Sequence, residues 1–348
     1  MKFIHTSDLH IGASKFLPDY LERQSNVIDK IFEAAKRLNI TTVCIAGDIF
    51  DNEDPSPTER DMVQKKLIAY DQAGFNILVI PGNHDQSNMN GYTSIHYLAL
   101  LYNQGKFYNS TITERTCFRV IDDTLFILLC HTPRQFKRDY QNAIEEVNSA
   151  SLKVPYKHIV VMIHETLKGS ITDTNWRLKG GVDVPPLEYG EEVEANNITY
   201  CAVGDIHVRQ KISARTFYCG APLQVKFGDQ WPKGVLVVDT EDPDNPIFEP
   251  IESKQLLRVN SLEDIPENCH IKLVTNKIEA LGTALPDNVM KIEYTKPEIQ
   301  DTILDLSKGL SLHQLVLEGV SQTLEGDDLI TAKREIDEMV QQIQQVDA

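Results

Sequence analysis

The sequence is constrained most by a series of short apolar runs, each followed by polar residues. The runs are rich in Val and Ile and do not alternate with polar residues, which is typical of strands covered on both faces. Helical patterns separate the first runs, and alternation of strand and helix predicts a layered α/β domain. The runs that we interpret as strands are Lys2–Thr6, Thr42–Ala46, Ile77–Ile80, Leu125–Cys130, His158–Ile163, Ile198–Val203 and Gly234–Val238.

Two helices are expected between the first three strands. Residues 27–38 place Val27, Ile31 and Leu38 on one apolar stripe. Residues 56–59, Ser-Pro-Thr-Glu, form a capping box with proline at the first helical position, so the second helix should begin there.

The pattern changes near residue 240 and predicts three parts. Residues 1–240 would form the large α/β domain, which ends at a Pro- and Asp-rich turn at 239–246. Residues 250–296 are expected to form a small α+β unit, with strands near Leu256–Val259, His270–Val274 and Met290–Tyr294. Residues 297–348 would be a helical tail. Its apolar stripe, from Asp327 to Val346, could pack on the chain's own domain or dock on a coiled coil of a partner.

Charge and cysteine content narrow the class of protein. The net charge is −17, and residues 241–348 carry 9 Lys and Arg against 22 Asp and Glu. Such a chain is a poor stand-alone nucleic-acid binder, so a nucleic-acid substrate would need metal ions or a partner to supply positive charge. The six cysteines form no CxxC pair, which suggests reduced core residues of a cytoplasmic protein. The longest apolar run, about five residues, is far below the ~20 of a membrane helix, and no membrane association is expected.

Polar clusters follow five of the predicted strands. Open α/β sheets bind ligands outside the carboxyl ends of their strands, so these clusters should converge. Carboxylates, an amide and imidazoles together suit manganese, iron or zinc, and a carboxylate shared by two ions would hold them about 3.5–4 Å apart. The clusters are Asp8 and His10; Asp48 and Asp51; Asn83, His84 and Asp85; His164 and Glu165; and Asp205 and His207.

These clusters resemble the pattern DxH, GDxxD, GNHD, a lone His and GHxH of the calcineurin-like metallophosphoesterase superfamily. Within it, the segments FIHTSDLHIG, IAGDIFD and Phe217–Asp229 are most similar to the SbcD-like DNA repair nucleases. The resemblance covers roughly residues 1–240. It implies a layered β-sandwich core flanked by helices, with a small α+β cap and a helical tail that binds a partner.

The resemblance also implies roles for single residues. The first metal ion would be held by Asp8, His10, Asp48 and His207, and the second by Asn83, His164, Asp205 and Asp48, which would bridge the two. His84 would be the acid or the group that stabilises the transition state, oriented by Asp85. The chain departs from the pattern at Asp205, where the family has His. A carboxylate can ligate the same ions, although its charge should change the preference of the second site.

Other residues keep two interpretations. Asp51 could be a ligand or could bond nearby backbone, and His131 has no role in the pattern. The segment Lys168–Lys179, with Trp176 and Arg177, could contact nucleic acid or cover its own domain. The basic residues Arg134, Lys137 and Arg138 are better explained as a solvated face.

The function that the resemblance implies is a two-metal DNA exonuclease and endonuclease. It would use manganese, with magnesium, iron or zinc as alternatives, and would work with an SMC-like ATPase of the SbcC type as a homodimer within a heterotetramer. Two rivals stay open, a stand-alone phosphodiesterase for nucleotides or cyclic nucleotides and a metal-dead scaffold for the ATPase. A protein phosphatase is disfavoured, since GDIFD lacks the following Arg-Gly and GNHD replaces GNHE.

Overall fold

The computed structural model describes residues 1–87, 92–132, 135–149, 155–172, 174, 176–179, 181, 198–229, 232–261, 268–275, 285–294, 317, 329–334 and 336. The chain divides into two compact units, one of Met1–Leu273 with Ala284–Ile292 and one of Val274–Thr283 with Glu293–Ala348. The two large sheets, helices α1 to α4 and the predicted metal ligands all belong to the first unit.

The first large sheet has six strands in the order β12-β11-β1-β2-β3-β4. Strands β1 to β4 run parallel, and β11 and β12 complete the sheet in antiparallel pairing. The bounds are β1 (Lys2–Thr6), β2 (Thr42–Ala46), β3 (Asn76–Ile80), β4 (Thr111–Ile112), β11 (Gly234–Asp239) and β12 (Ile247–Pro250).

The second large sheet also has six strands, in the order β5-β6-β7-β8-β10-β9. Its four central strands are parallel, whereas β5 and β9 pair antiparallel at the edges. The bounds are β5 (Cys117–Ile121), β6 (Thr124–Leu128), β7 (His158–His164), β8 (Tyr200–Gly204), β9 (Gln210–Ser213) and β10 (Thr216–Tyr218).

The two sheets pack face to face, and their central strands bury residues on both sides. Phe3, Leu78 and Leu236 of the first sheet share one buried cluster with Phe126, Met162 and Tyr200 of the second. The alternate residues of the same strands, such as Ile4 and Val43, belong to a different cluster that includes residues of the helices. The continuous apolar runs are therefore strands inside a β-sandwich.

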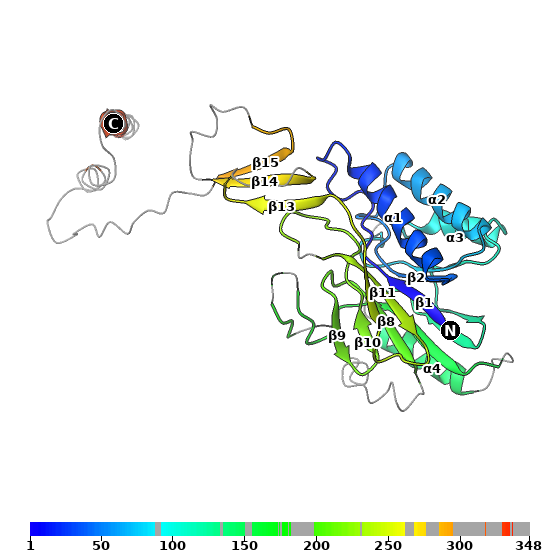
Figure 1. The fold of residues 1–348 in the computed structure, drawn as a ribbon. Helices are drawn as coiled ribbons and strands as arrows, with labels where there is room; N and C mark the ends of the chain where they lie inside the picture. The colour runs from blue at the N-terminus through cyan, green and yellow to red at the C-terminus, as the bar shows by residue number, and fades with distance from the viewer. Residues whose placement is uncertain are drawn as a thin grey trace, which may run out of the picture. The chain divides into compact units, whose positions relative to one another are not determined.

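Helices cover the outer faces of the sandwich. Helices α1 (Tyr20–Arg37), α2 (Pro57–Gln72) and α3 (His96–Asn103) pack on the first sheet, and Figure 1 shows them (blue to cyan) together on one side of β1 and β2. Helix α4 (Phe136–Asn148) packs on the second sheet. The predicted capping box at Ser56 and Glu59 is present at the start of α2. The expected helix-flanked sandwich is confirmed.

A third, three-stranded sheet is formed by β13 (Gln255–Val259), β14 (Cys269–Thr275) and β15 (Val289–Tyr294). Its strands lie where the sequence predicted them. Residues 329–334 are helical, and the rest of the predicted tail lies almost entirely outside the described residues, so the three-part division stays a prediction. All six cysteines are free thiols. In the described ranges, no helix is both long enough and apolar enough to cross a membrane.

Candidate metal centre

The predicted ligands lie at, or just after, the carboxyl ends of β1, β2, β3, β7 and β8, with His164 as the last residue of β7. The loops after β1 and β2 continue side by side, since the amide of Asp8 donates to the carbonyl of Gly47 at 3.0 Å and that of His10 to Asp48 at 3.1 Å. Asp8, His10, Asp48 and Asp205 have positive φ values, from 44° to 102°. Such φ values are uncommon for residues with side chains and cluster at functional sites. The backbone is thus turned sharply at each of these positions.

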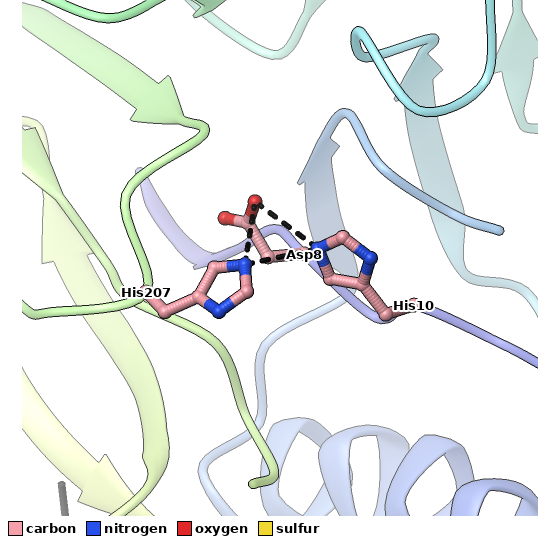
Figure 2. A group of neighbouring side chains, drawn as sticks. All are labelled: Asp8, His10 and His207. Atoms are coloured by element: carbon pink, nitrogen blue, oxygen red, sulfur yellow. Dashed lines mark hydrogen bonds and ion pairs between the residues drawn. The ribbon is translucent and has the colours of Figure 1, made fainter. Parts of the chain in front are cut away.

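One group of potential ligands consists of Asp8, His10 and His207. Their ligand atoms all lie within 4.8 Å of one another. The Nε2 atoms of His10 and His207 are 2.9 Å apart, and both lie about 4 Å from Oδ1 of Asp8, at 4.0 and 3.9 Å. Figure 2 shows the two rings turned toward each other and toward this carboxylate. Three side chains from two sheets thus point at one position, as a cation site requires.

Asp48 lies at the centre of the cluster. Its Oδ2 atom is 3.5 Å from Nε2 of His10 and 3.3 Å from Nε2 of His164. Its other oxygen, Oδ1, accepts a hydrogen bond from the backbone amide of His84 at 2.9 Å. One carboxylate therefore reaches both histidines, which is the geometry that a bridging ligand needs.

The second group gathers around His164. Its Nε2 atom is 2.9 Å from Oδ1 of Asn83 and 3.9 Å from Oδ1 of Asp205. Nδ1 of His164 lies 2.7 Å from the carbonyl oxygen of Ala46, which can only accept, so Nδ1 carries the proton and Nε2 can ligate. Thr166 donates to the carboxylate of Asp205 and fixes its direction. The residue that departs from the family pattern thus lies inside the cluster.

Two glycines make the close packing of this cluster possible. A Cβ atom at Gly47 would lie 2.1 Å from Nδ1 of His164, and one at Gly82 would lie 2.1 Å from Oδ1 of Asp48. Gly47 also has a φ of +88°, which side chains rarely adopt. The glycines that precede Asp48 and Asn83 are therefore both required by space, and Gly47 is also required by its backbone conformation.

The buried charges of the centre shift one another's pKa values. Burial, together with repulsion by Asp48, raises the pKa of Asp8 to about 6. Burial also disfavours the ionised form of Asp48, but the imidazoles of His164 and His10 hold its pKa well below the usual range. Burial lowers the pKa of His207 to about 3, helped by the charge of His10, so this ring is neutral near pH 7.

These charges fit a pair of divalent cations. Asp8 and Asp48 are fully or almost fully buried and lie beside each other, and among the described residues the imidazoles of His164 and His10 chiefly offset their charge. Cations would supply the missing positive charge without protonating the histidines. Carboxylate, imidazole and amide donors suit manganese, iron or zinc.

His84 lies at the exposed edge of the centre. Its ring meets that of His10 edge to face, with centroids 4.7 Å apart. Its Nδ1 donates to the carbonyl oxygen of Asp51 at 2.8 Å, which leaves Nε2 available to carry or transfer a proton. His84 also lines the cavity that opens beside the centre.

The carboxylate of Asp85 makes no direct hydrogen bond to the ring of His84, so an orienting role for Asp85 stays a prediction. The buried carboxylate of Asp85 instead accepts from the backbone amides of Ile49 and Phe50 at 3.1 Å, from Gly82 at 2.9 Å, and from the hydroxyl of Ser94 at 2.6 Å. These donors use both carboxylate oxygens. Asp85 therefore ties the loop after β2 to the loop after β3 and positions ligands without touching the acid.

Two supporting contacts were not predicted. Oδ1 of Asp51 lies 3.1 Å from Nδ1 of His10, so Asp51 holds a predicted ligand histidine through its side chain. His131 lies 2.8 Å from the carboxylate of Glu165 and 3.0 Å from the carbonyl oxygen of His164. The second aspartate of the GDxxD pattern is Asp51, so the sequence did contain a signal for its contact with His10. No sequence signal links His131 to Glu165, since the pair forms only when β6 and β7 lie side by side.

Two of the other basic or aromatic candidates, Trp176 and Arg138, have exposed side chains. The side chain of Trp176 is 66% exposed on a loop whose backbone forms an isolated bridge between Ile171 and Arg177. Arg134 lies outside the described residues.

A two-sheet sandwich with carboxylates and imidazoles gathered at its strand ends defines a metal-dependent phosphoesterase class. The model of the calcineurin-like phosphoesterase family matches residues 1–209, and the chain belongs to that family. Its members depend on divalent metal ions, in agreement with the candidate ligand groups.

Curated relatives share modest identity with the chain. It is 22% identical over 261 residues to the SbcD subunit of the nuclease SbcCD from Escherichia coli K12, covering 66% of this chain and 62% of that protein. For the protein of the same name in Bacillus subtilis, the values are 26% over 271 residues, with 69% and 66% covered. In Staphylococcus epidermidis they are 24% over 347 residues, with 89% and 88% covered. The chain thus spans slightly less than two thirds of the length of the first two relatives.

Proposed function

We propose that this chain is the metal-dependent nuclease subunit of a DNA repair, recombination or replication complex, hydrolysing phosphodiester bonds as an exonuclease and endonuclease. The observation that carries the proposal is the position of Asp48, whose Oδ2 lies 3.5 Å from His10 and 3.3 Å from His164. A carboxylate between two ligand groups is what a two-metal phosphodiesterase needs. The relatives named as nuclease subunits supply the substrate class.

The ligand assignment follows the two groups. Asp8, His10 and His207 would hold one ion, Asn83, His164 and Asp205 the other, and Asp48 both. Manganese is the proposed ion, because three carboxylates favour harder cations than zinc, with magnesium, iron and zinc as alternatives. When bound, the pair supplies positive charge to the phosphate oxygens and activates a water.

The residues of the chain then have separate tasks. His84 donates a proton to the leaving oxygen, or stabilises the charge that develops on it, through Nε2, while the carbonyl of Asp51 holds its Nδ1. The carboxylate of Asp51 keeps the ring of His10 in place. Asp85 fixes the loops that carry Asp48 and Asn83.

The partner is proposed to be an SMC-like ATPase of the SbcC type, in a heterotetramer with a homodimer of this chain, in the cytoplasm. The relatives are named as one subunit of the SbcCD nuclease, and residues 241–348 of this chain carry 9 basic against 22 acidic residues. Such an acidic region is poorly suited to binding the phosphate backbone of DNA. Residues 297–348 are therefore proposed to bind the partner, which would supply the grip on DNA.

One assay tests the function against its rivals. The purified chain with manganese is given a labelled DNA duplex, with and without the ATPase, and a small bis-nitrophenyl phosphodiester. Cleavage of both substrates, lost in Asp48→Asn, is expected. Cleavage of the small diester alone, even with the ATPase present, would favour a stand-alone phosphodiesterase. Cleavage of neither would favour the scaffold.

A further inference from the structure

A cavity of about 850 Å³ opens beside the metal centre, lined in part by His10, His84 and His207. Four lysines line it against one carboxylate among the described lining residues, namely Lys15, Lys226, Lys272 and Lys291 against Asp51. Lys15 lies 3.0 Å from buried Glu59, and Asp51 is bonded to His10. Although the whole chain carries a net charge of −17, positive charge gathers here, next to the centre. The cavity therefore suits a negatively charged chain.

Two aromatic rings share the wall of this cavity. Phe16 and Phe227 lie with ring centroids 5.7 Å apart and planes inclined by 30°. The side chain of Phe16 is 54% exposed, and Phe227 is partly exposed. Exposed aromatic faces beside basic residues are the components of a site that stacks unpaired bases while cations contact the phosphates.

The loops that carry the rings are fastened by hydrogen bonds. The hydroxyl of Ser14 donates to the carbonyl of Val225 at 2.5 Å and links the two loops. Asp229 accepts from the amides of Val225 and Lys226 at 2.8 and 3.2 Å. The amide of Gly12 donates to the side chain of Gln24 at 3.0 Å. The loops that carry the aromatic pair are thus linked before a ligand arrives, which lowers the entropy cost of ordering them on binding.

We propose that Phe16 and Phe227 form a stacking platform for an unpaired base, and that this platform selects single-stranded or frayed DNA next to the metal centre. The inference rests on the proposed nuclease function and adds the residues that decide which DNA form is accepted. A base inside a duplex has both faces covered by its neighbours and cannot use the platform. Stacking tolerates any base, so selection acts on strandedness and not on sequence.

A fluorescence titration tests the platform. A phosphorothioate-linked oligonucleotide with a terminal 2-aminopurine, whose emission falls on stacking, is titrated with the manganese-loaded chain, alone and annealed to its complement. The wild-type chain should quench the single strand and bind it more tightly than the duplex. Phe16→Ala and Phe227→Ala should each weaken single-strand binding about 5- to 150-fold and abolish the quenching.

Three controls sharpen the result. Phe16→Tyr should restore binding and quenching, since it keeps the ring. Tyr108→Ala removes an aromatic side chain that is 73% exposed and does not line the cavity, and should bind like the wild type. Thermal unfolding of each variant checks that it is folded.

Alanine variants that bind the single strand as the wild type does, or that lose duplex and single strand equally, would overturn the platform. If the wild type still cleaves DNA in that case, the nuclease function stands without the platform. A wild-type chain that neither binds nor cleaves DNA would overturn both.

Discussion

The ring of His84 is held by the backbone of Asp51, whose carbonyl oxygen lies 2.8 Å from Nδ1. This contact leaves the second ring nitrogen of His84 at the cavity. The backbone amide of His84, in turn, donates to Asp48 at 2.9 Å and does not depend on the side chain.

His84→Ala should therefore abolish catalysis and keep the metals. Loss of a proton-transferring group costs roughly 10²- to 10⁴-fold in rate. Elemental analysis should find two ions per chain, as in the wild type, because the hydrogen bond from the backbone amide of residue 84 to Asp48 does not depend on the side chain. Loss of metal from the variant would contradict the role of an acid and make His84 a ligand.

Asp48→Asn should empty both sites. Its carboxylate faces His10 and His164 at 3.5 and 3.3 Å, and an amide supplies neither the charge nor the second oxygen donor. Asp8→Asn is the matched comparison, since Asp8 should bind one ion only, and titration calorimetry should show that its second site survives. Equal loss of metal in both variants would argue against Asp48 as the bridge.

Asp205→His should restore the residue of the family pattern and change the second site. An imidazole carries one negative charge fewer than the carboxylate, so the bridging water should lose its proton more easily. The pH–rate profile should move toward lower pH, and the second ion should bind more tightly, with a greater preference for zinc. Steady-state rates between about pH 5 and 9 measure the first effect. An unchanged profile and metal preference would mean that Asp205 is not a ligand.

Asp71→Asn should destabilise the fold in a pH-dependent manner. Burial raises the pKa of this carboxyl, but hydrogen bonds from Tyr108, Asn109 and Ser110, at 2.7 to 2.9 Å, lower it below the ordinary value overall. Because the folded pKa lies below the unfolded one, the stabilisation is fully present above the unfolded pKa and is lost as pH falls through the folded pKa.

The expected loss at pH 7 is about 1–3 kcal/mol in the free energy of unfolding, shrinking below about pH 4. Denaturant titrations at pH 7 and below about pH 4 measure this loss in the free energy of unfolding. Asp61→Asn is the control, since Asp61 is exposed and pairs only with Lys65 one helical turn away. A loss that is the same at both pH values would show that the charge of Asp71 is not the cause.

The gathering of the candidate ligands could be predicted from the sequence because they lie at the ends of parallel strands, whose carboxyl ends share one edge of a sheet. Asp8, Asp48 and Asn83 satisfy this condition on the first sheet, and His164 and Asp205 on the second. The sequence did not predict that β5 and β9 would close the edges of the second sheet. Most of their residues are half-buried, and β9, with the sequence QKIS, has only a weak apolar signal.

The role of Asp85 could not be predicted for a different reason. The resemblance implied that Asp85 orients His84, but its buried carboxylate accepts from the amides of Ile49 and Phe50. Which way a side chain turns after a tight turn depends on loops that are distant in sequence. The contact of His131 with Glu165 could not be predicted for the same reason, since the two residues are distant in sequence.

The proposed ligands come from both sheets of the sandwich, Asp8, His10, Asp48 and Asn83 from one and His164, Asp205 and His207 from the other. Bound ions would therefore link the two sheets to each other. The sheets are otherwise joined through apolar contacts such as Phe3 with Phe126. Binding and folding are then linked thermodynamically. At a free metal concentration 100 times the dissociation constant, one ion would add about 2.7 kcal/mol to the stability of the sandwich. Chelation should accordingly loosen the packing between the sheets themselves, far from any loop that touches a metal.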